Sequence, residues 1–402
     1  MKRIVFAWEF GSGLGHIQRI LPLARKMQER GHEVICVMKH VIDAGKILSS
    51  HNIKIIQAPL WMVNVRQLPT TFSYPETLFN LGYLVPGALL SMTKAWQNLL
   101  EPIKPDLLIA DHAPTALIAT HGADCKRVLY GNGFFSPPRK TPMPLIVPWA
   151  KTPAGLLEYS DNKALQTVNH VLNELGRPNL QKFYNLFDVD EDFLATFAEL
   201  DHYQERGAVR YWGPPPGKAG GETPRWPDTS NSKKIFCYIK PAYPHFEELL
   251  TGLQQAGVST VIFSPAVPEK ILKKYQTDKL CFHQEPVDIH KACQEADMVL
   301  CHAGVGTVAN SLLHGKPMLL LPEHDHQLEQ ILTARNVVKL KAGLMLMTIE
   351  KKRDYKGLIQ KVLIEQQFAE NAQKIATKYE DFSPESQLEK IAERCEDLMY
   401  DL

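Results

Sequence analysis

The feature that most limits how this chain can fold is a glycine-rich turn in its second half. An apolar run ending at Cys301 predicts a buried strand, and it is followed directly by the sequence HAGVGT (residues 302–307). A helix is expected next, because Gly315 and Pro317 form a common helix stop. The turn would open that helix, so bare backbone N–H groups and the helix dipole predict an anion site, with phosphate the natural occupant. The alternative is an ordinary strand–helix turn that binds nothing.

Apolar runs of strand length alternate with helical patterns along the whole chain. They fall at residues 3–8, 34–38, 53–56, 107–110 and 127–130, and again at 235–239, 259–263 and 298–301. Continuous apolar runs are typical of central parallel strands. Their alternation with helices predicts the α/β class with doubly wound parallel sheets.

A polar segment rich in proline and glycine divides the chain. Residues 213–221 read GPPPGKAGG, and the sequence stays polar to about Lys234. A chain of 402 residues is about two to three times the usual domain length. We therefore expect a Rossmann-like domain over residues 1–213, a linker over 214–234 and a second Rossmann-like domain over 235–382. A proline-rich stretch at 134–165 predicts an irregular wall or flap in the first domain.

Composition excludes several classes of protein. The net charge is +1, which gives no support to a nucleic-acid binder. Seven cysteines without a C-x-x-C pair favour a reducing cytoplasm. The most apolar long window, 78–92, contains Asn80, Gly82 and Pro86, so no transmembrane segment is expected. That window is open to two other readings, an amphipathic lid or a face that makes peripheral contact with a membrane.

A second glycine-rich loop follows the first strand. Its sequence, GSGLGH (residues 11–16), resembles a dinucleotide-binding fingerprint, but His16 stands where the third glycine is needed. The next strand ends in Met38-Lys39, without the acidic ribose ligand of that motif. Nicotinamide and flavin cofactors are therefore not expected.

Both glycine-rich segments resemble GT-B glycosyltransferases, of the family 1 (UDP-glycosyltransferase-like) type of plants and bacteria. The motifs that carry the resemblance are His302-x-Gly304-x-Gly306-Thr307, Gly315-x-Pro317, Glu329-Gln330 before Thr333-Ala334-Arg335, Gly15-His16 before Pro22-Leu23, and Gly31-His32-Glu33-Val34. The resemblance implies two facing Rossmann-like domains with a donor and acceptor cleft between them. It also implies that the last helix, about 383–402, packs back on the N-terminal domain, and that no metal is required.

The resemblance implies that His16 is the catalytic base and Asp111 its partner. A sugar transfer with inversion needs a group of near-neutral pKa to take the acceptor proton. A carboxylate on the other ring nitrogen would fix the tautomer and stabilise the cation. Asp111 follows a buried strand, where such sites form in parallel sheets. The alternatives are a loop histidine, an aspartate that caps the helix beginning near Pro114, and His112 as a competing base that points elsewhere.

The donor side is expected to hold a UDP- or dTDP-linked sugar. The residues assigned to it are Gly13, Gly15, Lys240, Phe282, His302, Gly304, Val305, Gly306, Thr307, Asn310, Glu329 and Gln330. Asn310 stands where many relatives have a glutamate for the ribose, and the loop from Pro322 to Glu329 is about three residues longer than usual. A similarly long loop occurs in the related N-acetylglucosaminyltransferase of peptidoglycan synthesis. Gln327 is an alternative to Gln330 as the sugar ligand.

These residues predict an inverting hexosyltransferase that uses a small, partly apolar acceptor with a hydroxyl or amine. Its pocket would be lined by Trp61, Phe72, Phe79 and Tyr83, which equally fit a plain core. His324-Asp325-His326 lacks a further ligand cluster at metal-site spacing, so no metal is expected. The rivals are a nucleotide-sugar epimerase or hydrolase and a catalytically silent accessory subunit. A monomer or a homodimer is expected.

Overall fold

The computed structural model describes residues 1–402 except 12–14, 63–70, 204–205, 218–220, 228–231 and 325–326. Its contacts divide the chain into two compact units. The first unit consists of Met1–Thr196, Tyr203–Pro215 and Ser383–Leu402, and the second of Phe197–His202 and Pro216–Phe382. Most of the segment 214–234 therefore groups with the second unit, as does the short piece Phe197–His202.

The first unit is built on a parallel six-stranded sheet in the order β3-β2-β1-β4-β5-β6. Its central strands are apolar and buried, because helices cover both faces of such a sheet. The strands are β1 (Arg3–Trp8), β2 (Glu33–Met38), β3 (Lys54–Gln57), β4 (Leu107–Ala110), β5 (Lys126–Gly131) and β6 (Glu191–Leu194). The helices are α1 (Gly15–Glu29), α2 (Val41–Leu48), α3 (Tyr74–Leu78), α4 (Pro86–Ile103), α5 (Pro114–Ala119), α6 (Leu156–Glu174) and α14 (Pro384–Tyr400), with short turns at Ser49–His51, Phe79–Tyr83 and Phe183–Phe187.

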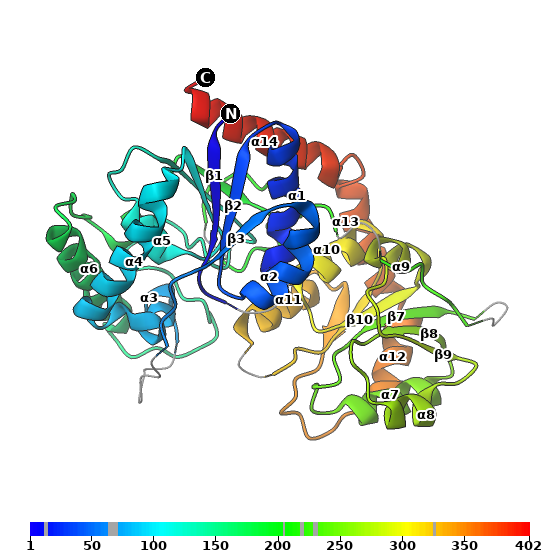
Figure 1. Ribbon diagram of the computed structural model, residues 1–402. Coiled ribbons are helices and arrows are strands. Elements are labelled where there is room, and N and C mark those ends of the chain that lie inside the picture. The colour runs from blue at the N-terminus through cyan, green and yellow to red at the C-terminus, as the bar shows by residue number, and fades with distance from the viewer. Residues whose placement is uncertain (12–14, 63–70, 204–205, 218–220, 228–231, 325–326) are drawn as a thin grey trace. The chain divides into compact units, whose positions relative to one another are not determined.

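The last helix of the chain, α14, belongs to the first unit and packs against α1 (Figure 1). Its buried face, which includes Ile391 and Cys395, joins the core formed by α1 and the sheet. At the rim of this contact Arg30 pairs with Glu389 and Glu396, and the ring of His32 bonds to Glu396 at 2.8 Å. Helix α14 thus shares one hydrophobic core with α1 and the first sheet.

The second unit repeats the plan with a parallel sheet in the order β12-β11-β10-β7-β8-β9. Its strands are β7 (Lys234–Tyr238), β8 (Ser259–Phe263), β9 (Leu280–His283), β10 (Met298–Cys301), β11 (Met318–Leu320) and β12 (Gly343–Met345). Its helices are α7 (Phe246–Ala256), α8 (Glu269–Tyr275), α9 (Ile289–Glu295), α10 (Val305–Leu313), α11 (Leu328–Lys339), α12 (Tyr355–Ile364) and α13 (Gln366–Lys378), with a short turn at Ala198–Leu200. The predicted α/β class with two doubly wound parallel sheets is confirmed.

Each sheet has one point at which the strand order reverses. In the first unit it lies between β1 and β4, and in the second between β7 and β10. Ligands of doubly wound sheets bind at the carboxyl ends of the strands beside such a point. His16 follows β1 and Asp111 follows β4, whereas Lys240 follows β7 and His302 follows β10. The sequence-predicted residues therefore come from the strand ends where a site is expected.

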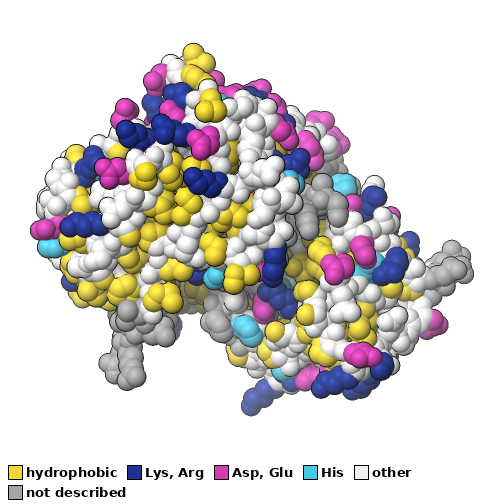
Figure 2. All heavy atoms as spheres, in the orientation of Figure 1, with side chains coloured by type: hydrophobic (Ala, Val, Ile, Leu, Met, Phe, Trp, Pro, Cys, Tyr) yellow, Lys and Arg dark blue, Asp and Glu magenta, His cyan; other side chains and the backbone are white. Residues whose placement is uncertain are grey.

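The surface agrees with the near-zero net charge. On the face drawn in Figure 2, acidic and basic side chains are mixed and no extended basic stripe is visible. Among the helices of the described residues, none is long and apolar enough to cross a membrane. The apolar window at 78–92 forms the turn Phe79–Tyr83 and the first part of α4. All seven cysteines are free thiols.

Candidate active site

His16 and Asp111 form a buried hydrogen-bonded pair in the first unit. His16 lies in the first turn of α1, and Asp111 follows β4 with its backbone N–H bonded to Ala7. The His16 Nδ1 atom lies 3.0 Å from Asp111 Oδ2, and both side chains are less than a tenth exposed. An ionised carboxylate at Nδ1 requires the ring proton to be there, which leaves the lone pair on Nε2. This is the tautomer that a general base needs.

Arg19 is a second partner of the same carboxylate. It is three residues beyond His16 and therefore on the same face of α1. Its Nη1 atom donates to Asp111 Oδ1 at 3.0 Å and to Oδ2 at 3.1 Å. Burial alone would raise the pKa of Asp111, but the charges of Arg19 and His16 outweigh it and lower that pKa. The sequence prediction missed Arg19, although its spacing from His16 was visible.

Aromatic rings and one glycine fix the imidazole of His16. Trp8 stacks on it with ring centroids 4.8 Å apart, and Phe135 lies 5.9 Å away on a nearly parallel plane. Gly11 has φ +91°, and a Cβ atom there would lie 2.7 Å from His16 Nε2. Glycine is needed at this position both for its backbone conformation and for the close approach of the ring.

His112 lies close to His16 rather than pointing elsewhere, which corrects the sequence prediction. Its ring stacks on Phe135 with centroids 3.4 Å apart and planes within 8°. The hypothetical Cβ of Gly11 would lie 3.7 Å from His112 Nδ1, so this nitrogen and His16 Nε2 both lie within 4 Å of one point. Burial, and next the charges of His16 and Lys39, lower the pKa of His112 well below its usual value. A histidine this hard to protonate is a poor competitor as general base.

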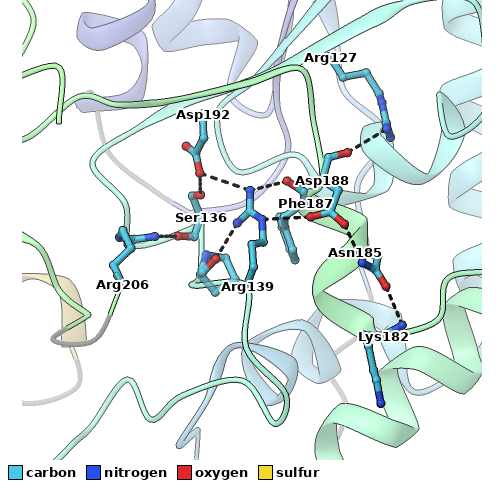
Figure 3. Close-up of polar contacts among 10 residues, drawn as sticks. Arg127, Ser136, Arg139, Lys182, Asn185, Phe187, Asp188, Asp192 and Arg206 are labelled. Carbon is cyan, nitrogen blue, oxygen red and sulfur yellow. Dashed lines mark hydrogen bonds and ion pairs between the residues drawn. The ribbon is translucent and has the colours of Figure 1, made fainter. Parts of the chain in front are cut away.

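An ion-pair network holds the loop that carries Phe135 (Figure 3). Asp192 accepts a hydrogen bond from Ser136 Oγ at 2.5 Å and pairs with Arg139 at 3.3 Å. Arg206 donates to the backbone carbonyls of Ser136 and of Gly133, the latter at 3.0 Å. Burial is the main cause that raises the pKa of Asp192. Nothing in the sequence marked these residues, because they meet only through the fold of the proline-rich segment.

The four aromatic residues assigned to the acceptor differ in burial. Phe79 and Tyr83 are buried, and Tyr83 bonds to Thr115 at 3.1 Å. Their burial favours the alternative that they are core. Trp61 and Phe72 are partly exposed, and the indole of Trp61 packs against Gly82.

In the second unit, the turn after β10 leaves the amino end of α10 open. Gly304 and Gly306 are exposed, and an added Cβ at either would meet nothing within 4 Å. Thr307 is buried, and Asn310 donates to the carbonyl of Gly306 at 3.0 Å. The backbone N–H groups of the first turn have no intrahelical acceptors. Together with the helix dipole they form the predicted anion-binding end.

His302 does not have a ring nitrogen available for a phosphate. Its Nδ1 atom donates to the carbonyl of Leu321 at 2.8 Å, and its Nε2 atom accepts from the backbone N–H of Lys240 at 3.0 Å. Burial is the main cause that lowers the pKa of His302, which suits a neutral ring with one donor and one acceptor. His302 therefore ties the end of β10 to the segments after β7 and β11, instead of contacting the diphosphate directly as expected.

Lys240 faces a carboxylate that the sequence prediction missed. Its Nζ atom lies 2.9 Å from Glu323, and the backbone N–H of Glu323 donates to Gln330 Oε1 at 2.7 Å. Burial would raise the pKa of Glu323, but Lys240 outweighs it and lowers that pKa. Glu323 comes directly after Pro322, so the lengthened loop was the available signal. Lys240, Glu323 and Gln330 form one cluster.

The remaining residues assigned to the donor lie in different parts of the structure. Phe282 is buried in the core of the second unit, which disfavours a role in stacking on the base. Glu329 is half-buried and its carbonyl accepts from Thr333, and Gln327 precedes α11. Gly15, the first residue of α1, lies in the first unit.

Three residues considered in the sequence analysis cannot be compared with the structure. Gly13 lies outside the described residues, as do Asp325 and His326 of the motif considered for a metal. Among the residues that are described, no group of three or more His, Cys, Asp or Glu side chains is placed to hold a metal ion.

Comparison with known proteins is consistent with this geometry. Residues 266–394 match the glycosyltransferase family 28 C-terminal domain. No curated protein matches the sequence. Similar solved structures include the calicheamicin glycosyltransferase CalG4, at 15% identity and a TM-score of 0.70 over 99% of this chain and 98% of that one. The spinosyn rhamnosyltransferase SpnG with thymidine diphosphate has 17% identity and a TM-score of 0.65 over 97% and 100%. The glycosyltransferase VinC with dTDP has 15% identity and a TM-score of 0.68 over 98% and 100%.

The structural similarity at this low identity establishes the fold, and the family match identifies the type of C-terminal domain. The sequence pattern resembles the family 1 type, whereas the family whose model matches is family 28. The expected GT-B fold is confirmed. The chain therefore has the fold of the GT-B glycosyltransferases, and its residues 266–394 match a glycosyltransferase family 28 C-terminal domain.

Proposed function

We propose that this enzyme transfers a hexosyl group, with inversion, from a UDP- or dTDP-linked sugar to a hydroxyl or amine of a small, partly apolar acceptor. The observation that carries the proposal is the buried pair of His16 and Asp111, with the imidazole lone pair on Nε2. Donor binding is supported by the open amino end of α10 and by Lys240 in the second unit.

In the proposed reaction, His16 Nε2 takes the proton of the acceptor while the acceptor oxygen or nitrogen attacks the anomeric carbon. The bond from that carbon to the diphosphate oxygen breaks, and its electron pair leaves with the nucleoside diphosphate. Asp111 stabilises the imidazolium that forms. The α10 N-terminus and Lys240 stabilise the leaving diphosphate. A single displacement of this kind inverts the anomeric centre.

Two comparison structures support a thymidine-linked donor. The SpnG and VinC structures both contain thymidine diphosphate. Asn310 replaces the glutamate that many relatives direct at the ribose, and an amide still hydrogen-bonds a hydroxyl without charge assistance. We propose that no metal is needed, because Lys240 and the helix dipole provide the positive potential, and we expect EDTA to leave transfer unchanged.

The proposal is tested by nucleotide binding and transfer measured together. UDP or dTDP is expected to raise the melting temperature, since a ligand that binds only the folded state stabilises it. Transfer from the matching sugar nucleotide to an acceptor panel should fall about 100-fold or more in His16→Ala and in Asp111→Asn, with the thermal shift unchanged. His170→Ala, at an exposed position of α6, is the matched control. Unchanged transfer in both site variants would contradict the dyad, and isomerised or free sugar formed without acceptor would indicate an epimerase or hydrolase.

A further inference from the structure

His112 has no function in the proposed reaction, yet it is a buried histidine beside the base. The residue is only 6% exposed, and neither Nδ1 nor Nε2 makes a hydrogen bond of normal geometry, although the backbone of Phe10 is close enough to act against the fall in its pKa that burial causes. A neutral imidazole carries one donor and one acceptor. Buried polar atoms without partners are rare in folded proteins, and each one requires an explanation such as a water or a ligand.

The ring lines a small notch at the carboxyl ends of β4 and β5. The notch has a volume of about 10 Å³, and its polar lining comes from Asp111, His112, Asn132 and Ser136. Tyr74 and Phe135 supply apolar walls. This space is about that of a single water molecule. It therefore admits one small polar group of a ligand and excludes a whole ring.

The backbone of His112 has a separate structural task. Its φ is +51°, and its carbonyl accepts hydrogen bonds from the backbone N–H groups of Glu9 and Phe10 at 3.3 and 3.0 Å. Histidine and asparagine both tolerate this backbone region better than most residues. The carbonyl contacts do not require an imidazole, so the function of the side chain can be tested apart from that of the backbone.

We propose that His112 is a binding residue for the acceptor and that it receives a second oxygen, next to the hydroxyl that His16 deprotonates. The inference rests on the proposed function, because it uses His16 as the base. A Cβ added to Gly11 would lie 2.7 Å from His16 Nε2 and 3.7 Å from His112 Nδ1, so the two nitrogens are no further apart than the sum of these distances. Two oxygens on adjacent carbons span such a separation when each accepts or donates one hydrogen bond. The substrate class is therefore a vicinal diol or an ortho-hydroxy carbonyl compound. Phe135, which stacks on both imidazoles, suits a flat apolar body.

The test compares two probes that differ by one oxygen, 2,3-dihydroxynaphthalene and 2-naphthol. Their dissociation constants are measured by calorimetry without any sugar donor, so that the result does not depend on transfer. The full-length enzyme should bind the diol about ten-fold or more tightly, because an unfilled buried hydrogen-bonding site rejects the ligand that lacks the group.

Three variants separate hydrogen bonding from shape. His112→Phe keeps a flat ring against Phe135 and removes both nitrogens, so it should bind the two probes equally. His112→Asn tolerates the positive φ and should keep part of the preference. His121→Phe makes the same chemical change at a histidine of the first unit that does not line the notch, and it should keep the full preference.

The outcomes distinguish this inference from the proposed function. A diol preference that disappears in His112→Phe supports the site even if no transfer is ever observed. The inference is overturned if the preference survives in His112→Phe, if the wild type shows none, or if neither probe binds. A more stable His112→Phe with unchanged preference would mean that the notch holds only water. With a donor present, the kcat/KM ratio of the two probes should follow the same pattern.

Discussion

One buried carboxylate, Asp111, serves two side chains of helix α1. Arg19 and His16 both contact it at 3.0 Å, so a proton taken up by His16 places two cations against one anion. Burial is the main cause that lowers the pKa values of His40 and His112, and the charge of His16 is also among the causes. Arg19 therefore shares the carboxylate with His16 and holds it in place beside the Nδ1 atom.

Replacing Arg19 should weaken transfer. In Arg19→Gln, Asp111 loses the positive charge that lowers its pKa and the hydrogen bonds that hold it beside His16, so we expect kcat/KM for transfer to fall about three- to ten-fold. Arg19→Lys keeps the charge and should resemble the wild type. Arg25→Gln, at an exposed position of the same helix, is the control. An undiminished kcat/KM in Arg19→Gln would contradict this role.

Glu9 is a buried acid that couples stability to pH. It is 0% exposed, its Oε2 accepts from the backbone N–H of Thr115 at 3.0 Å, and its Oε1 has no partner. Burial raises its pKa from 4.5 to about 8, although hydrogen bonds from Thr115 act in the opposite direction. The folded protein thus keeps a proton that the unfolded chain releases above pH 4.5. Stability contributed by this group should fall as the pH rises from about 4.5 to about 8 and then level off.

Substituting Glu9 should flatten that pH dependence. In the wild type the unfolding free energy should fall by about 3 to 4 kcal/mol between pH 5 and pH 8 through this group, and we expect Glu9→Gln to lack that fall. Urea unfolding curves at the two pH values measure it. Glu33→Gln, which removes an exposed carboxylate at the start of β2, should retain the wild-type decrease. Equal slopes for Glu9→Gln and the wild type would show that Glu9 is ionised in the folded state.

At the scale of elements, both candidate sites follow from the same arrangement of strand, loop and helix. α1 and α10 each begin after a glycine-rich segment at the switch point of a parallel sheet. The two helix N-termini are nevertheless used differently. The first turn of α1 carries His16, whereas the first turn of α10 has exposed glycines that leave its backbone N–H groups accessible.

A carboxylate at Gly306 should separate the binding role of α10 from its stability. In Gly306→Asp the added Cβ has nothing within 4 Å, and an acidic residue in the first turn interacts favourably with the helix dipole. The melting temperature without nucleotide should therefore stay the same or rise slightly. The apparent affinity for UDP or dTDP, obtained from the thermal shift, should fall at least about ten-fold, because the new carboxylate repels the diphosphate. Gly306→Ala should retain the shift, and an undiminished shift in Gly306→Asp would place the diphosphate elsewhere.

At the scale of the whole molecule, the chain forms two units whose membership does not follow chain order. Phe197–His202 belongs to the second unit and α14 to the first. In the second unit Asn336 donates to the carbonyl of Asp201 at 2.9 Å, and the ring of His202 bonds to Thr333 at 2.9 Å. α14 shares a core with α1 and the first sheet. Each unit thus depends on a segment that is distant in sequence.

Hydrogen exchange should report the nucleotide in one unit. Adding the nucleotide that raises the melting temperature should slow exchange at the α10 N-terminus and around Lys240, because bound N–H groups are protected and local opening is suppressed. The strands of the first unit and α14 should exchange as before. Protection centred on β1 and β4 would instead assign the nucleotide to the first unit.

Local sequence patterns predicted the central strands, their parallel arrangement and the strand ends at which the candidate sites lie, but not the outer strands β6, β9 and β12. They could do so because apolar runs, glycine turns and helix stops act over a few residues. The resemblance to GT-B glycosyltransferases also paired His16 with Asp111, and both residues follow central strands of one sheet. The role of this pair stays a prediction until transfer is measured.

Only the tertiary structure decided which side chains meet across those elements. Arg19, Glu323 and the Asp192 network became visible because hydrogen bonding depends on distances between segments that are far apart in sequence. Both ring nitrogens of His302 form hydrogen bonds with the backbone, whereas those of His112 make none of normal geometry. A residue type in a motif shows what chemistry is available, whereas packing decides which of its atoms remain free to perform it.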